Sequence, residues 1–83
     1  LNTLYVQTQG AYLRLDGETL RVEAEDESGA RGLRLQMPLH HLGGITVFGN
    51  VLLSPFLLQR CAEDGRAVVW HSRGGRFVGR LAG

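Results

Sequence analysis

Three histidines are the side chains of this sequence best suited to bind a transition metal, because neutral imidazole is a common ligand of such ions. His40 and His41 are adjacent, and the third is His71. Adjacent side chains point to opposite faces of a strand and about 100° apart around a helix, so neither geometry brings both rings to one ion. The sequence has no His-Glu-x-x-His spacing and only one cysteine, so no ligand set is completed. We interpret the histidines as surface or hydrogen-bonded side chains.

One cysteine and two pairs of carboxylates are the remaining candidates for catalysis. A nucleophilic cysteine needs a nearby base and an activating environment, but Cys61 falls on the apolar face of an expected helix. We interpret it as a small core side chain. The pairs Glu23/Glu25 and Glu63/Asp64 lie on an expected wet strand face and near an expected helix end. Both positions are typical of solvated charges and not of general acid–base catalysis.

The glycines and the chain length argue against a self-contained enzyme. The segment from Gly43 to Gly49 lacks the lysine and the Ser/Thr pattern of a phosphate-binding loop. Twelve glycines are instead typical of turns and bulges between short strands. A chain of 83 residues forms one small domain at most, whose core leaves little room for a deep catalytic cavity. We expect a binding module or a piece of a larger protein, and we disfavour a stand-alone hydrolase.

Charge is distributed unevenly along the chain, although the net charge is only +1. Residues 1–30 carry two arginines against six acidic side chains, whereas residues 31–83 carry seven arginines against two. Clustered arginine near aromatic side chains can follow a phosphate backbone, because charge neutralisation dominates such binding. A hairpin with ordinary charged flanks is the other interpretation. The candidate DNA-backbone contacts are Arg66, Arg73, Arg76 and Arg80.

Short strands are the elements that must position these side chains. Alternating apolar and polar residues separated by turn signals predict about seven strands, which contain residues 4–6, 12–16, 19–25, 33–37, 45–48, 67–71 and 76–81. One helix is expected over residues 55–64, because Ser54 can cap it, Pro55 suits its first turn and Gly65 suits its end. The predicted class is mainly β (α+β): a small, mostly antiparallel sheet or sandwich with a single helix.

Composition indicates a globular chain, with 43% hydrophobic and 20% charged residues. No apolar run approaches the roughly 20 residues of a membrane span, and the start lacks a secretory signal pattern. A single cysteine cannot form an internal disulfide. We therefore expect a cytoplasmic protein without membrane contact. Because the sequence starts with Leu1 and not with methionine, we also expect it to be a fragment.

The order and spacing of these motifs resemble the N-terminal β-domain of the CRISPR-associated spacer-acquisition endonuclease/integrase family (Cas1), in the branch found in type I-C systems. The resemblance covers essentially the whole chain, and no single motif is diagnostic. The matching segments are Leu4-Tyr5-Val6, Gly10 to Leu13, Leu15-Asp16-Gly17, Met37-Pro38-Leu39, His41-Leu42, Ile45 to Gly49, Val51 to Pro55, Cys61 to Gly65, Val69-Trp70 and Gly75 to Arg80.

This resemblance implies that residues 1–83 are one β-domain of a longer protein, whose C-terminal helical domain holds a divalent-metal site. The parent would be a Mg²⁺- or Mn²⁺-dependent DNA endonuclease/integrase that inserts foreign DNA into the CRISPR array, in complex with a second small CRISPR-associated protein. None of the family's metal ligands falls on this sequence, so the fragment alone should be inactive. The β-domain would supply homodimer contacts and part of the DNA platform.

Two functional classes remain open from the sequence. The first is this scaffold and dimerisation domain, for which Val51, Leu52 and Leu53 are candidate dimer contacts. The second is a free-standing OB-like or SH3-like β-barrel that binds nucleic acid. A base-stacking platform needs exposed aromatic side chains. The sequence favours the first class, because only Tyr12 is expected on a polar face, whereas the other aromatic side chains considered fall in apolar elements: Phe48, Phe56, Trp70 and Phe77.

Overall fold

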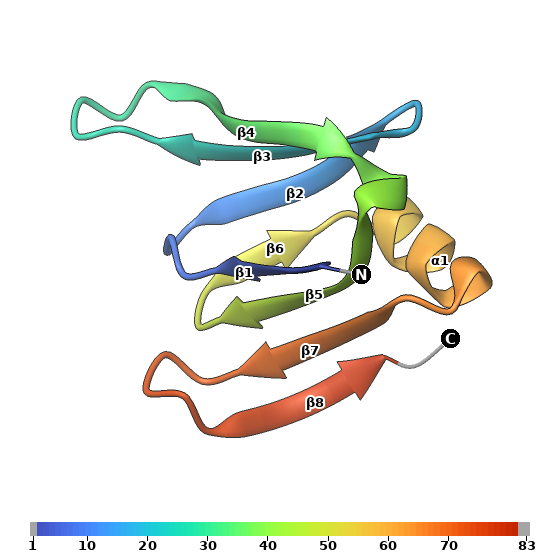
Figure 1. The fold of residues 1–83 in the computed structure, drawn as a ribbon. Coiled ribbons are helices and arrows are strands. Elements are labelled where there is room, and N and C mark those ends of the chain that lie inside the picture. Colours follow the sequence, from blue (N-terminus) through green and yellow to red (C-terminus); the bar gives the residue numbers. More distant parts are fainter. Residues whose placement is uncertain (1, 82–83) are drawn as a thin grey trace.

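The computed structural model describes residues 2–81, which form two four-stranded sheets and one α-helix (Figure 1). The first sheet has the order β1-β5-β7-β8, with β1 (Asn2–Val6), β5 (Leu42–Phe48), β7 (Ala67–His71) and β8 (Phe77–Leu81). The second sheet has the order β4-β3-β2-β6, with β4 (Arg31–Pro38), β3 (Thr19–Glu25), β2 (Ala11–Asp16) and β6 (Val51–Leu53). A 3-10 turn, η1 (Leu39–His41), precedes β5, and the helix α1 (Pro55–Asp64) follows β6.

The predicted class, mainly β with one helix at residues 55–64, is confirmed. The strand pairing is more mixed than expected, because β1–β5, β5–β7 and β2–β6 are parallel while β2–β3, β3–β4 and β7–β8 are antiparallel. Within the described residues, both sheets end in unpaired edge strands, β1 and β8 in one and β4 and β6 in the other. The closed-barrel alternative is therefore not what this chain forms.

Two local details differ from the sequence-based expectation. Strand β6 is an eighth strand that the sequence pattern did not predict. Its three residues, 51–53, are too few to show a periodic pattern. Strand β5 starts at Leu42, before the expected residues 45–48, because Gly43 and Gly44 both lie inside it. A Cβ atom on Gly44 would lie only 3.0 Å from the Ala67 carbonyl oxygen of the neighbouring strand. Glycine at this position permits close approach of β7, as glycine in a strand interior commonly does.

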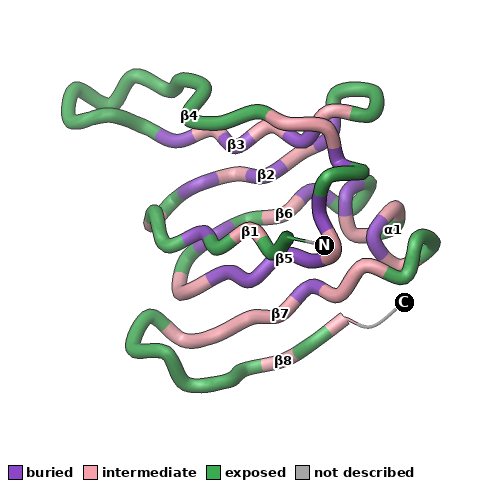
Figure 2. Tube along the Cα trace, viewed as in Figure 1, coloured by how far each residue is buried: buried purple, intermediate pink, exposed green. Residues whose placement is uncertain are grey.

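Alternating side chains from both sheets make one hydrophobic core. Leu13 and Leu20 in the second sheet, and Ile45, Val47 and Val68 in the first, are fully buried. Figure 2 shows this burial concentrated in the middle strands, while β4 and β8 are largely exposed. Removing this apolar surface from water is the main favourable contribution to folding. The exposed edge strands β4 and β8 therefore present apolar and charged side chains that are available for contacts with partners.

The helix closes one end of the molecule and begins and ends as its sequence predicts. The Ser54 hydroxyl accepts a hydrogen bond from the Leu57 N–H at 3.1 Å, and Gly65 ends the helix with a left-handed φ of 74°. Leu57 and Cys61 are buried in the core. Burial raises the pKa of the Cys61 thiol above its ordinary value. The interpretation of this cysteine as a core side chain is confirmed by its burial. A buried thiol with a raised pKa is also a poor nucleophile.

An ion pair ties the helix to the β2–β3 turn. Arg60 donates to both carboxylate oxygens of Glu18, from Nη1 at 2.8 Å and from Nη2 at 2.9 Å. The hydrogen bonds between the two side chains favour both charged forms, so they lower the pKa of Glu18 and raise the pKa of Arg60. The Glu18 side chain is 75% exposed, so water screens the pair. Its two-point geometry contributes more to the orientation of the helix than to stability.

The side chain of Gln9 joins the two places where the chain crosses from the first sheet to the second. Its Nε2 donates to the Phe48 carbonyl oxygen at 2.8 Å and to the Gln7 carbonyl oxygen at 2.9 Å, and its Oε1 accepts from the Asn50 N–H at 2.7 Å. Gly49, with φ of +75°, leaves room for this amide, since a Cβ there would collide with it. The β1–β2 and β5–β6 connections are thus fastened side by side.

We predict that Gln9→Ala lowers the free energy of unfolding by about 2–4 kcal/mol, because three hydrogen bonds worth about 0.5–1.5 kcal/mol each are lost together. Urea denaturation followed by circular dichroism measures this. The matched control is Gln59→Ala on the exposed side of α1, which should change stability by less than about 0.5 kcal/mol. Equal effects of the two substitutions would show that the Gln9 contacts do not hold the crossings together.

No helix among residues 2–81 combines the length and the apolar character needed to span a membrane.

Candidate nucleic-acid interface

Arg66 is held inside the fold. Its Nε donates to the Leu42 carbonyl oxygen at 2.8 Å, and its guanidinium pairs with Asp64. Only 17% of its side chain is exposed. These contacts link the end of α1 to the start of β5. Arg66 therefore has fewer donors left for a DNA backbone than the other candidates, because its Nε and its charge already contact the protein.

The other three candidate arginines lie together at the β7–β8 hairpin. Arg73 and Arg76 are in the turn and Arg80 is on β8, and all three are exposed. Within the described part of the chain, none of them forms an ion pair with a carboxylate. No acidic residue occurs after Asp64. This edge therefore presents positive charge that the carboxylates of residues 2–81 do not neutralise.

The hairpin turn that carries Arg73 and Arg76 has a defined shape. The Ser72 N–H donates to the Arg76 carbonyl oxygen at 2.6 Å, and the Ser72 hydroxyl accepts from the Arg76 N–H at 3.0 Å. Gly75 has a φ of 94°, a left-handed conformation that glycine adopts without strain. The turn thus holds the backbone at both arginines in place.

Aromatic rings line the outer face of the first sheet beside this hairpin. The register pairs Phe48 with His71 and His71 with Phe77. The Phe48 and His71 rings are stacked, with centroids 4.9 Å apart and planes at 17°. His71 and Phe77 meet edge to face at 6.1 Å. His71 is half-buried between two rings, and its buried Nδ1 has no hydrogen-bond partner within residues 2–81, so the expectation of a hydrogen-bonded histidine is not met at this nitrogen.

The expectation that the aromatic side chains are internal is wrong for Phe56 and Phe77, although Trp70 packs against the core and Phe48 is half-buried. Tyr5, Phe56 and Phe77 are each about 60% exposed. Tyr5 and Phe77 lie on β1 and β8, the two edges of the first sheet. Phe56 lies in the first turn of α1, away from its buried face. An apolar run in the sequence marks a strand or helix, but it does not tell which of its faces receives a covering layer. The argument from aromatic content against a stacking surface therefore does not hold.

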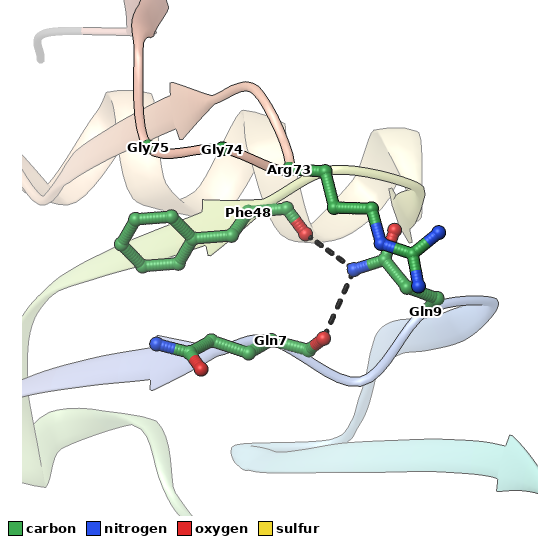
Figure 3. A pocket seen from close by; sticks show the side chains of 6 residues that line it. All are labelled: Gln7, Gln9, Phe48, Arg73, Gly74 and Gly75. Atoms are coloured by element: carbon green, nitrogen blue, oxygen red, sulfur yellow. Dashed lines mark hydrogen bonds between the residues drawn. The ribbon is translucent and has the colours of Figure 1, made fainter.

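A hollow of about 370 Å³ opens between the β7–β8 turn and the first crossing of the chain (Figure 3). In Figure 3, Gln7 and Phe48 flank it, Arg73 extends toward Gln9, and the two glycines leave one wall without side chains. Sequence reasoning missed Gln7 and Gln9, since no motif marks an amide that acts across 39 or more residues of chain. The lining residues are Gln7, Gln9, Phe48, Arg73, Gly74 and Gly75.

The candidate dimer contacts divide between the core and the surface. Val51 is 7% exposed and belongs to the core, because alternate residues of β6 face inward, so it offers little surface for a dimer contact. Leu53 is half-buried and packs against the same core. Leu52 is 58% exposed and pairs with Tyr12 on the outer face of the second sheet. Of the three residues, Leu52 alone offers substantial apolar surface.

The groups considered for catalysis are otherwise structural or solvated. His40 and His41 are exposed in η1, as expected for surface histidines. Glu23 accepts hydrogen bonds from Arg14 Nε and Nη2 at 3.2 and 3.1 Å. Among residues 2–81, no three His, Cys, Asp or Glu side chains gather closely enough to hold a metal ion.

Comparison with known sequences gives one consistent result. The profile of a family described as CRISPR associated protein Cas1 matches residues 4–83. A Moorella thermoacetica protein named CRISPR-associated endonuclease Cas1 1 is 49% identical over 100% of this chain and 23% of its own length. A Chlorobaculum tepidum protein of the same name is 43% identical over the same shares. The chain thus spans about a quarter of the length of the relatives it matches.

Solved structures share the fold. A CAS1 protein from Thermotoga maritima has a TM-score of 0.74 and 26% identity, covering 99% of this chain and 24% of that one. A chain of a Cas6-RT-Cas1–Cas2 complex has a TM-score of 0.82 at 18% identity, over 99% of this chain and 8% of that one. A TtCas1–DNA complex has a TM-score of 0.67 at 21% identity, over 95% and 28%. The last two structures are less than 25% identical to this chain, so they show only that the fold is shared.

Proposed function

The chain belongs to the Cas1 family of CRISPR-associated proteins, and from this membership we propose that it is the N-terminal scaffold of a spacer-acquisition endonuclease/integrase, giving dimer contacts and part of the DNA platform. The observation that carries the DNA role is the unneutralised arginine edge of Arg73, Arg76 and Arg80. Arginine is well suited to phosphate because its planar guanidinium donates two parallel hydrogen bonds. The TtCas1–DNA complex among the solved structures of this fold supports the same role.

We propose that cleavage and strand joining take place outside residues 1–83, at a site that uses Mg²⁺ or Mn²⁺. Such hard ions need several oxygen ligands converging on one point. The described residues offer no such donor set, and the relatives named endonucleases are about four times longer than this chain. Within this proposal, residues 1–83 bind and orient DNA and do not react with it.

The proposed partners are DNA, a second copy of the chain and a second small CRISPR-associated protein, in a cytoplasmic complex that inserts foreign DNA into the CRISPR array. The solved complex that contains both Cas1 and Cas2 supports the protein partner. Unpaired edges at β4 and β6, with exposed Leu33, Leu35 and Leu52 nearby, support self-association. An open edge presents donors and acceptors that a symmetric copy can pair with.

The DNA role predicts a specific salt dependence. If the three arginines each neutralise one phosphate, log K for duplex DNA against log salt should have a slope of about −2.7. The double substitution Arg76→Gln/Arg80→Gln should reduce it to about −0.9. The matched control is Arg31→Gln/Arg34→Gln, which removes two exposed arginines on β4. Fluorescence anisotropy at five salt concentrations measures both. Equal losses in the two variants would contradict binding at the β7–β8 edge.

The scaffold role predicts a dimer. Sedimentation equilibrium over a hundredfold concentration range should give a mass approaching twice 9.1 kDa. Leu52→Glu should shift the protein toward the monomer, because a charge replaces apolar contact surface. Leu33→Glu, at another exposed leucine on the opposite edge of the sheet, is the control. A wild-type chain that stays at 9.1 kDa would contradict dimerisation, and dissociation by Leu33→Glu alone would place the contact at β4.

A further inference from the structure

We propose that the hollow beside the β7–β8 turn binds one unpaired nucleotide of single-stranded DNA, with its base against Phe48 and its phosphate on Arg73. The hollow is defined by six lining residues and about 370 Å³, within the range of about 300–1,000 Å³ typical of small-ligand pockets. The proposal rests on the proposed DNA role of this domain and adds the form of DNA that it recognises.

Phe48 is the stacking surface of this site. One side of its ring lies against His71 at 4.9 Å, and His71 is supported in turn by Phe77. The register places Gln7 next to Phe48 on the other side, since Val6 pairs with Val47 and each chain continues by one residue. The hollow lies between these two side chains (Figure 3). A base entering there would extend an aromatic stack that already exists, and base–aromatic stacking tolerates any base.

Polar groups are placed for the base edge and for the phosphate of a nucleotide. The side-chain amide of Gln9 is committed to the backbone of both crossings and forms a fixed wall. Gln7 and Arg73 make no side-chain hydrogen bond to the other lining residues. An amide of this kind can both donate to and accept from a base edge, and a guanidinium can bind a phosphate. Gly74 and Gly75 add no side chain that would block entry.

Charge selects a polyanion over the other possible occupants. The described chain after Asp64 has no acidic side chain, and Arg73, Arg76 and Arg80 lie on the same β7–β8 hairpin as His71 and Phe77. A second copy meeting this face around a two-fold axis would bring like charges together, which is destabilising. Paired bases of a duplex are stacked on one another and cannot enter a hollow. An unpaired nucleotide supplies both the flat ring and the phosphate that the site matches.

Fluorescence of 2-aminopurine tests this proposal in the complete gene product. The probe is placed in the unpaired tail of a partial duplex, and a second substrate carries it inside the duplex. Stacking on Phe48 should quench the tail probe and leave the duplex probe unchanged. Phe48→Leu should abolish the quenching and weaken binding of a dT oligonucleotide by about 5- to 150-fold. Arg73→Gln should reduce the salt slope for that oligonucleotide by about 0.7.

Matched controls separate this site from general attraction. Phe56→Leu removes an exposed ring on α1, outside the hollow, and Arg31→Gln removes an exposed arginine on β4, so both should leave quenching unchanged. If Phe48→Leu fails to fold, Gln7→Ala, whose side chain lines the hollow, should still reduce quenching. Duplex binding with no quenching of the tail probe would overturn the nucleotide site and leave the proposed DNA role intact. Absence of binding to every DNA form would overturn both.

Discussion

The double crossing of the chain between its two sheets is the constraint on which the rest of this structure depends. β1 leads into β2 and β5 leads into β6, so two parallel pairs, β1–β5 and β2–β6, pass from one sheet to the other side by side. The Gln9 side chain joins the two connections, and the Gly10 N–H adds a bond to the Asn50 carbonyl oxygen at 2.6 Å. A half-buried amide that bonds to three backbone groups at once holds the two connections in one arrangement.

This fastening also sets where the chain can meet other molecules. The Gly49 N–H donates to the His71 carbonyl oxygen at 2.9 Å, so the crossings are joined to the end of β7. The β7–β8 turn therefore lies beside them, at the opposite end of the molecule from α1 (Figure 1). The aromatic stack, the hollow and the arginine edge all follow from this placement. Rigid neighbours of this kind reduce the ordering cost of binding.

Features that depend on neighbouring residues could be predicted from the sequence, whereas those that depend on distant ones could not. The cap at Ser54, the helix end at Gly65 and the β2–β3 turn at Gly17 follow from local backbone chemistry. The parallel pairing of β6 and the amide bonds of Gln9 depend on contacts about 40 residues apart. The clustering of the three C-terminal arginines could be seen in the sequence. The internal partners of Arg66 and the exposure of Phe77 could not be predicted without knowing the order of the strands in the sheet.

Hydrogen–deuterium exchange of the complete gene product, with and without a partially single-stranded DNA, tests the central claim most directly. If DNA lies across the crossings and the β7–β8 hairpin, backbone amides at residues 7–10 and 72–76 should exchange more slowly in the complex. Amides at residues 26–30, in the distant β3–β4 turn, should be unchanged. Protection confined to the β3–β4 turn, or unchanged exchange at both predicted segments under saturating DNA, would contradict the account.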